Sequence, residues 1–145
     1  MKKEIAEKWV RALRSEKYRQ TKGALKIKNK AGKTSHCCLG VLCELYQSEQ
    51  RKAGKPLLPT TAVPAGGYGC DIPAASRVFE FADQGVVLPA KVTRWAGLDD
   101  DCGMFRGEFS TKHDGYIYCG LAEMNDKGCQ FSTIADVIEK NAEHL

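Results

Sequence analysis

Residues 24–40 read ALKIKNKAGKTSHCCLG, and this stretch predicts a β-hairpin. Apolar and polar side chains alternate over 24–28, as they do in a strand with one buried face. Residues 29–32 have the composition of a tight turn, and the chain returns as a partner strand over 35–39. We expect Gly40 to end this second strand.

Helices are predicted on both sides of the hairpin, because apolar side chains recur there at helical spacing. Proline favours the first turn of a helix, glycine its end and serine its N-cap. The predicted helices cover 3–18, 41–52, the segment from Leu88-Pro89 to Gly97, 121–127 ending at Gly128, and a final stretch from Ser132.

Strands of a second hairpin are expected at 104–110 and 116–119. The segment between them contains Asp114-Gly115, and Asp-Gly is a strong signal for a tight hairpin turn. Residues 54–73 hold four prolines and four glycines and predict a long loop, either a functional arm or a dispensable insertion. A short helix and a short strand both remain open for 74–82.

These elements predict an α+β fold in a single small domain, residues 1–145. We expect one small antiparallel sheet of hairpins, packed with helices and followed by a C-terminal helix pair. The content of 43% hydrophobic and 28% charged residues excludes a disordered chain, a collagen-like chain and a coiled coil. No apolar run approaches the roughly 18 residues that span a bilayer, and Glu4, Glu7 and Lys8 interrupt any signal peptide. We therefore expect a cytosolic protein with no membrane partner.

Positive charge is concentrated at the N-terminal end of the chain. Residues 1–33 carry 12 basic and three acidic side chains, whereas the other 112 residues carry 10 and 15. A basic third on an acidic body favours a phosphate-bearing partner, although a solvated surface explains it equally well. The segment from Arg14 to Lys26 adds Tyr18 and Gln20 to this charge, which are groups able to stack on a base and to read its edge.

Seven cysteines are present, an odd number, with no Cys-x-x-Cys spacing. We interpret them as reduced thiols, several of them small apolar core residues. We expect no metal, no cofactor and no catalytic residues. An enzyme that uses zinc or a thiol from the 36–43 cluster stays open as an alternative, and Asp99-Asp100-Asp101 is interpreted as a solvated acidic turn.

Three blocks of sequence occur together: WVxALRS at 9–15 with YxQxxGAL at 18–25, HCCLGVLCELY at 36–46, and LAEMNDxGxxFxxIAxxIE at 121–139. In order and wording they resemble a family of small proteins from tailed bacteriophages and prophages. The resemblance covers most of the chain and least of all the 54–73 loop. It implies an origin and no particular activity, and small accessory phage proteins often act by binding.

We therefore hypothesise a phage-encoded, non-enzymatic binding protein that counters antiviral defence in the host cytoplasm. Its ligand would be a phosphate-bearing nucleotide signal, held in a pocket of a homo-oligomer. The candidate ligand-binding residues are Arg14, Lys22 and Arg106 for phosphate, Tyr18 or Trp95 for stacking, and Gln20 for selecting the base. The alternatives are a nucleic-acid-binding accessory protein and a direct protein–protein inhibitor of a host factor.

Overall fold

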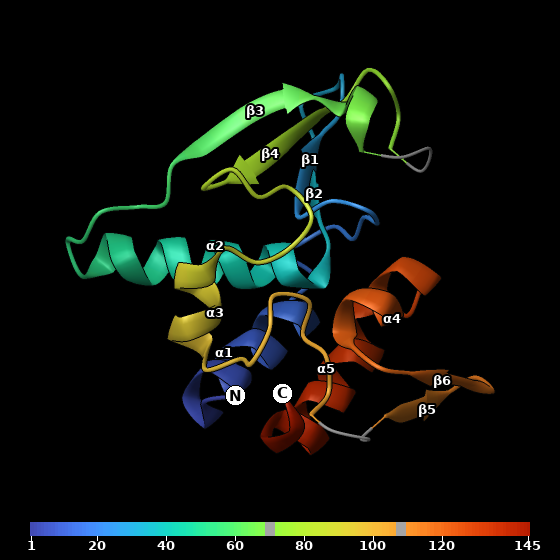
Figure 1. Cartoon of the computed structure of the whole chain (residues 1–145). Coiled ribbons are helices and arrows are strands. Elements are labelled where there is room, and N and C mark those ends of the chain that lie inside the picture. Colours follow the sequence, from blue (N-terminus) through green and yellow to red (C-terminus); the bar gives the residue numbers. More distant parts are fainter. Residues whose placement is uncertain (69–71, 107–109) are drawn as a thin grey trace.

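The computed structural model describes residues 1–68, 72–106 and 110–145. The elements follow in the order α1 (Lys3–Arg14), β1 (Lys26–Lys28), β2 (Thr34–His36), α2 (Cys38–Lys52), β3 (Thr60–Pro64), η1 (Ala65–Gly67), β4 (Arg77–Phe81), α3 (Ala90–Ala96), β5 (Thr111–His113), β6 (Tyr116–Tyr118), α4 (Leu121–Lys127), α5 (Phe131–Asn141) and η2 (Ala142–His144). The α+β class is confirmed (Figure 1).

The main core lies between the helices. Helix α1 buries one face, from Ile5 to Leu13, against α5 and α2. Trp9 is fully buried at its centre, and its indole Nε1 donates to the carbonyl of Cys38 at 3.0 Å. The helix ends at Arg14, four residues earlier than predicted, because Glu16 takes a left-handed conformation with φ of 57°.

Helix α2 begins earlier than predicted, because it includes two residues that we expected in the preceding strand. Cys37 is its N-cap, and the thiol accepts the N–H of Gly40 at 3.4 Å. Glycine is required at position 40, since a Cβ there would lie 1.7 Å from the carbonyl oxygen of Leu25. The helix start therefore lies directly against the chain entering β1, and the predicted strand 35–39 is wrong beyond His36.

The first hairpin is confirmed, and it belongs to a larger sheet. Strands β1 and β2 pair antiparallel, and the four-stranded order is β2-β1-β4-β3. Strand β4 resolves the open choice for 74–82, and β3 lies inside the predicted 54–73 loop. That loop prediction is wrong because TTAVP shows no apolar alternation, while its pairing with β4 is a tertiary contact.

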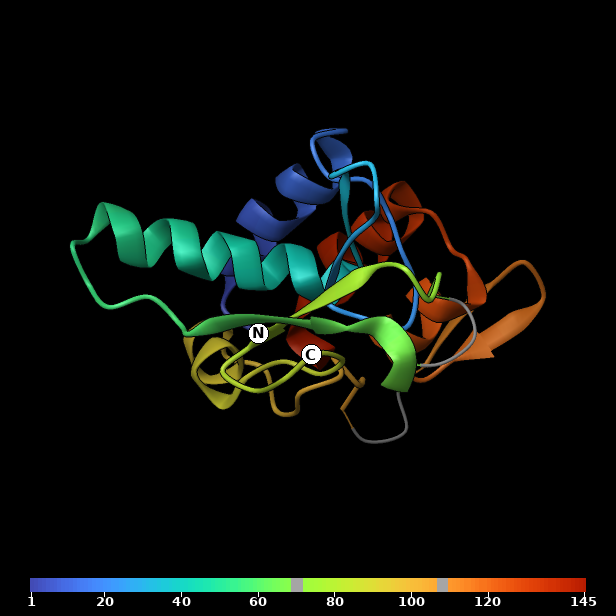
Figure 2. The ribbon, with the colours of Figure 1, turned by 90° about the horizontal axis from the view of Figure 1, so that it is seen from above.

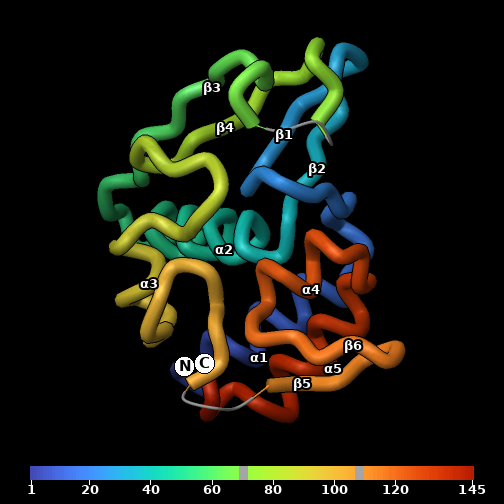
Figure 3. The backbone as a smooth tube through the Cα atoms, turned by 45° about the vertical axis from the view of Figure 1, so that its right-hand side comes forward, coloured from blue at the N-terminus to red at the C-terminus, as the bar shows by residue number. Residues whose placement is uncertain are grey.

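The sheet stands at one end of the molecule and most of the helices at the other, with α2 between them (Figures 1 and 3). Figure 2 looks down on the sheet from above, with β3 running across the view. Val78 is fully buried in a small cluster with Ala24, Ile27, Ala65 and Ile72. Phe81, near the end of β4, belongs to the main core instead. The sheet therefore has a small core of its own and joins the helical core at one end.

The second hairpin forms a separate two-stranded sheet, so the single sheet that we expected is wrong. Asp114 and Gly115 both have positive φ, 49° and 83°, as a primed hairpin turn requires. Its first strand is β5, later in the chain than the predicted 104–110. Within that range Met104 makes an isolated bridge with Gly120, and residues 107–109 lie outside the described part.

The C-terminal helix pair is confirmed as α4 and α5, with Gly128 ending α4 in a left-handed conformation. The N-cap of α5 is Gln130 rather than Ser132, since the side chain of Gln20 supplies the acceptor for the N–H of Phe131. The two ends of the chain meet, and the amino group of Met1 donates to the carbonyl of Ala142 at 3.1 Å. None of the helices formed by the described residues is long and apolar enough to cross a membrane.

Candidate functional site

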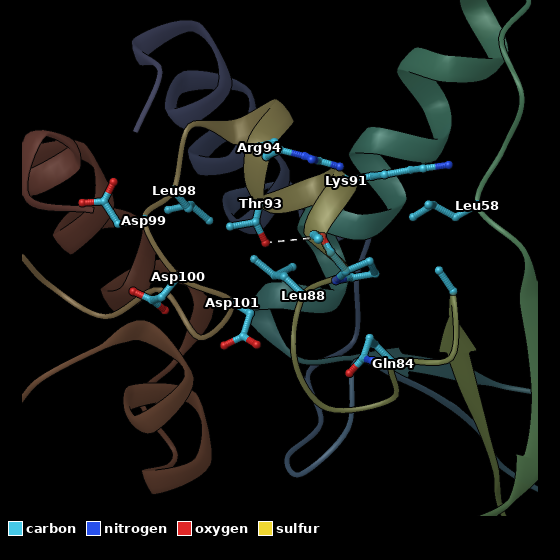
Figure 4. A pocket seen from close by; sticks show the side chains of 13 residues that line it. Leu58, Gln84, Leu88, Lys91, Thr93, Arg94, Leu98, Asp99, Asp100 and Asp101 are labelled. Carbon is cyan, nitrogen blue, oxygen red and sulfur yellow. Dashed lines mark hydrogen bonds between the residues drawn. The ribbon is translucent and has the colours of Figure 1, made fainter.

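A hollow of about 840 Å³ lies beside α3, where residue 58 meets the segment 82–101. Its wall is formed by residue 58, by the 82–89 loop, by α3 itself and by the turn that follows α3. Ligand pockets commonly range from about 300 to 1,000 Å³. The lining residues are Leu58, Ala82, Gln84, Leu88, Pro89, Ala90, Lys91, Thr93, Arg94, Leu98, Asp99, Asp100 and Asp101 (Figure 4).

The apolar part of this hollow is held by hydrogen bonds from the protein interior. The buried side chain of Gln47 on α2 holds Leu58 from both sides: its Nε2 donates to the carbonyl of Leu58 at 3.0 Å, and its Oε1 accepts the Leu58 N–H at 2.9 Å. The N–H of Leu88 donates to the carbonyl of Asp101 at 2.9 Å. These bonds fix two leucines of the lining in place, so the hollow is formed without a ligand.

Lys91 and Arg94 supply positive charge to one end of the hollow. They lie one helical turn apart on α3, and Figure 4 shows both side chains extending in the same direction, toward the segment of Leu58. Among the described residues neither side chain makes an ion pair or a hydrogen bond. Two cations that the fold leaves unpaired, next to an apolar wall, suit an anionic ligand with an apolar part.

The carboxylates lie at the other end of the hollow and are largely used by the fold (Figure 4). Asp99 pairs with Arg106, whose Nη2 donates to its Oδ1 at 3.0 Å. Asp100 accepts the backbone N–H groups of Cys102 and Met104, at 2.7 and 3.1 Å. Only Asp101 keeps most of its acceptor capacity, and because backbone N–H groups do not neutralise Asp100, this end of the hollow is anionic.

The acidic turn at 99–102 is poorly suited to binding a metal ion. Asp100, Asp101 and Cys102 present ligand atoms within 4.8 Å of one another. Burial, helped by the hydrogen bond to Asp101, raises the pKa of the Cys102 thiol to about 11. A metal ion would have to displace the proton of this thiol, and Asp100 already accepts from two backbone donors, so the cluster is poorly arranged for a metal ion.

Three of the predicted ligand-binding residues, Arg14, Tyr18 and Gln20, do line one hollow, of about 480 Å³. Arg14 is held there by α5, since its Nη2 lies 2.6 Å from Asp136 Oδ1 and 2.7 Å from Glu139 Oε2. The hydrogen bond to Glu139, and then that to Asp136, raises the pKa of this guanidinium. The Arg14 charge is therefore already neutralised by the protein.

The amide of Gln20 is likewise engaged in structural hydrogen bonds. Its Nε2 donates to Asn125 Oδ1 at 3.0 Å and to the carbonyl of Cys129 at 2.8 Å, and its Oε1 accepts the N–H of Phe131. Tyr18 lies edge-on to the His36 ring at 5.3 Å, packed against the core. This region has the composition of a binding site, but its polar groups stabilise the fold.

The other three predicted residues lie elsewhere. The ammonium of Lys22 covers Gly128 at the end of α4, where a Cβ would lie 3.1 Å from it. The Trp95 ring packs edge-on to Tyr46 at 5.4 Å, half-buried on α3, and does not belong to the lining described above. Arg106 is paired with Asp99. The structure therefore does not bring the six residues into one site.

A second polar cluster lies under Tyr18. Glu44 on α2 accepts from Lys26 Nζ at 2.7 Å and lies 3.5 Å from His36 Nε2. Burial acts to raise the pKa of Glu44, but the nearby His36 and Lys26 outweigh it and bring the value to about 2. His36 is buried, and neither ring nitrogen has a hydrogen bond of good geometry among the described residues.

The described cysteines are free, and four of the six are buried, as the sequence predicted for core thiols. Burial raises the pKa of Cys37 to about 12, and it raises those of Cys38 and Cys43 well above the ordinary value. None of these three is a ready nucleophile near neutral pH. Cys70 lies outside the described residues.

Sequence reasoning missed the hollow beside α3. Lys91 and Arg94 carry no local signal, because a basic pair one turn apart on a short helix is usually a solvated face. They differ from other unpaired cations in that they line a hollow, which depends on bringing residue 58 against the segment 82–101.

Comparison with known proteins places the chain in a family. No curated protein matches it, and no solved structure matches it. One family model, described as "Domain of unknown function (DUF8296)", matches residues 1–142. That match covers almost the entire sequence, and the chain belongs to this family.

Proposed function

We propose that this protein is a non-enzymatic binding protein that holds a small phosphate-bearing molecule, with a nucleotide as the ligand class, in the hollow beside α3. One observation carries the proposal. Lys91 and Arg94 line a preformed hollow of about 840 Å³ and have no anionic partner among the described residues. Phosphate contacts to Arg and Lys are charge-assisted hydrogen bonds, about twice as strong as neutral ones.

The remaining lining suits the rest of a nucleotide. Leu58, Leu88 and Leu98 offer an apolar wall for a base or another ring, and the Gln84 amide offers both a donor and an acceptor. Asp101 can accept from an amino or hydroxyl group at the far end. Phosphate, apolar and polar subsites thus lie within one hollow.

The groups that surround the hollow favour ligand binding without a catalysed reaction. Its hydroxyl, on Thr93, donates to the carbonyl of Pro89 at 3.3 Å. The nearest thiol in sequence, Cys102, has its pKa raised to about 11 by burial and by Asp101. The Thr93 hydroxyl makes no hydrogen bond to a base among the described residues. Asp101 Oδ1 lies 3.4 Å from Cys102 Sγ, but it favours the protonated thiol over the thiolate that would act as a nucleophile.

The biological setting of this proposal rests on the resemblance to phage proteins. A phage-encoded protein in the host cytoplasm that sequesters a nucleotide signal would counter antiviral defence without any catalytic residue. Such a protein needs high affinity and a preformed pocket, because sequestration competes with the host receptor for the same molecule.

Isothermal titration calorimetry tests the proposal with four probes: inorganic phosphate, AMP, cyclic AMP and ADP-ribose. We expect at least one nucleotide to bind more tightly than phosphate. Replacing both cations by alanine, in Lys91→Ala/Arg94→Ala, should weaken that binding by about tenfold or more per cation.

The matched control is Arg11→Ala/Lys127→Ala, which removes the same charge from exposed residues that do not line the hollow. It should retain the affinity. Absence of heat with all four probes, or equal loss in both double variants, would contradict the site. If the Lys91→Ala/Arg94→Ala protein also retained its full effect in infected cells, a direct protein–protein inhibitor would be favoured instead.

A second candidate function, nucleic-acid binding, is favoured by the outer end of the four-stranded sheet. Lys28 on β1 lies directly opposite Arg77 on β4, and like charges in that position destabilise a sheet. Lys30 and Lys33 are exposed in the adjoining turn. Among the described residues none of these four cations has an ion pair, so a phosphate backbone would relieve their repulsion.

Salt dependence tests this second candidate. Binding to a fluorescent duplex should weaken steeply between 50 and 200 mM salt if phosphate contacts release counterions, by roughly tenfold or more for a few contacts. Lys28→Ala/Arg77→Ala should reduce the slope, and Arg11→Ala/Lys127→Ala should not. Affinity that does not change with salt would exclude a phosphate-based nucleic-acid site.

A further inference from the structure

Strand β3 forms one edge of the four-stranded sheet, and its outer side is unoccupied among the described residues. Its five residues, TTAVP, are uncharged, and four of them are exposed. An exposed strand edge is a ready template for pairing with another strand. The surrounding chain is also uncharged, since 56–68 contains no Lys, Arg, Asp or Glu.

The ladder between β3 and β4 shows which backbone groups face outward. The N–H of Ala82 donates to the carbonyl of Pro59, and the N–H of Ala65 donates to the carbonyl of Ser76. Hydrogen-bonded positions alternate along an antiparallel pair, so the odd positions from 59 to 65 face β4. The even positions, Thr60, Ala62 and Pro64, therefore turn their backbone groups away from the sheet.

Those outward groups complement themselves. If two β3 strands pair antiparallel with Ala62 opposite Ala62, each Ala62 N–H reaches the Ala62 carbonyl of the other strand. Each Thr60 N–H then reaches the carbonyl of Pro64. Pro64 has no N–H, so Thr60 and Ala62 provide all the outward donors. The two strands together would form four hydrogen bonds, and no outward donor would be left unpaired.

The flanking residues agree with this register. The exposed Leu57 of one copy would lie toward the Gly66–Gly67 turn of the second copy, where a Cβ meets nothing within 4 Å. A larger residue at that turn would compete with Leu57 for the space. Pro59 and Pro64 also bracket the strand, which limits the pairing to a short segment that an equally short strand matches.

We propose that β3 pairs with β3 of a second copy of this chain, joining two four-stranded sheets into one across a two-fold axis at Ala62. The neutral strand allows this approach without charge repulsion, although the whole chain carries a net charge of +4. The proposal is independent of the ligand, since the α3 hollow belongs to each chain alone.

Native mass spectrometry and light scattering on the full chain, over a range of concentrations, provide the test. The unsubstituted protein should be a dimer at high concentration. Ala62→Pro removes the outward N–H without touching the ladder to β4, and the loss of two hydrogen bonds per dimer should raise the dissociation constant about 5- to 150-fold.

Ala62→Lys gives a second, charge-based route, because it places two ammonium groups opposite each other at the axis. Ala53→Lys adds the same charge at an exposed position after α2 and should leave the dimer intact. Amide hydrogen exchange provides a readout without any substitution: the Ala62 amide should exchange more slowly in concentrated than in dilute protein. A monomer at every concentration, or a dimer that both Ala62 variants retain, would overturn the proposal.

Discussion

Two regions hold similar side chains in opposite conditions: the seam in which residues 14–20, at and after the end of α1, meet α4 and α5, and the hollow beside α3. In the seam, Arg14 is bound by Asp136 and Glu139. In the hollow, Lys91 and Arg94 have no such partner among the described residues. A cation that is already paired contributes little to a ligand, since binding would first have to break the existing pair. The two regions contain the same types of side chain and differ in whether those side chains are free to contact a ligand.

The same contrast holds for the amides. Gln20 uses its amide in the seam to hold α4 and α5 together through Asn125, Cys129 and Phe131. Gln84 lines the hollow, and no hydrogen bond of its side chain is present among the described residues. Four variants follow in decreasing order of expected effect. Three test whether the seam is structural and the hollow functional, and the one at Glu44 tests the polar cluster under Tyr18.

Asn125→Ala should have the largest effect, because it removes the side-chain amide at the centre of the hydrogen-bond network in the seam. Asn125 is fully buried, and its Oδ1 accepts from Gln20 Nε2 and from the buried N–H of Cys38. Leaving buried donors unpaired costs about 1–3 kcal/mol each. We expect the free energy of unfolding in urea to fall by about 3 kcal/mol.

Asn141→Ala is the control for that measurement. Its Nδ2 makes one hydrogen bond, to the carbonyl of Val137 on the same helix, and the residue is half-buried. The loss should stay below about 1 kcal/mol. Equal losses in the two asparagine variants would contradict the structural reading of the seam.

Gln47→Ala should come second, with effects on both stability and the hollow. It leaves the N–H and carbonyl of Leu58 without the side chain that binds them, at a cost of about 2 kcal/mol. Leu58 would also be released, so nucleotide affinity should fall. Gln50→Ala on the same helix, whose side chain makes no hydrogen bond among the described residues, should change neither property.

Glu44→Gln should remove part of the acid sensitivity of the protein. A carboxyl whose folded pKa is about 2, below its ordinary 4.5, stabilises the fold above pH 4.5, and this stabilisation is lost as the pH falls toward 2. Urea midpoints measured from pH 6 to pH 2 should therefore decline more steeply in the unsubstituted protein than in the variant. Parallel curves would show that Lys26 and His36 do not depress this pKa.

Arg14→Ala should have the smallest effect. Its ion pairs with Asp136 and Glu139 are solvent-exposed, and exposed pairs contribute little to stability. Nucleotide affinity should not change, because the residue does not line the α3 hollow. A strong loss of nucleotide affinity, with the urea midpoint of unfolding retained, would indicate that the ligand binds in the seam and not in the hollow.

Much of the fold could be predicted because its signals are local. The apolar face of α1, the proline before α3 and the Asp114-Gly115 turn each fix a short segment by themselves. Strand β3 could not be predicted, since TTAVP shows no alternation and is a strand only through its pairing with β4. The start of α2 was missed because Cys37 acts as its cap.

The candidate site could not be predicted for a related reason. Sequence gives the chemistry of Arg14 and Gln20, but not the carboxylates and carbonyls that tertiary structure brings to them. It likewise gives no sign that Lys91 and Arg94 would lie next to Leu58, which is more than 30 positions earlier in the chain. The fold decides which polar side chains are left free.

A titration followed by ¹⁵N-correlated NMR tests the location of the site most directly. Increasing AMP, cyclic AMP or ADP-ribose is added to the labelled protein, with inorganic phosphate as the reference. We predict chemical-shift changes at the amides of Leu58, Gln84, Lys91 and Arg94, and unchanged signals at Arg14, Tyr18 and Gln20. Changes confined to the last three residues, or no changes with any nucleotide, would contradict the assignment of ligand binding to the hollow beside α3.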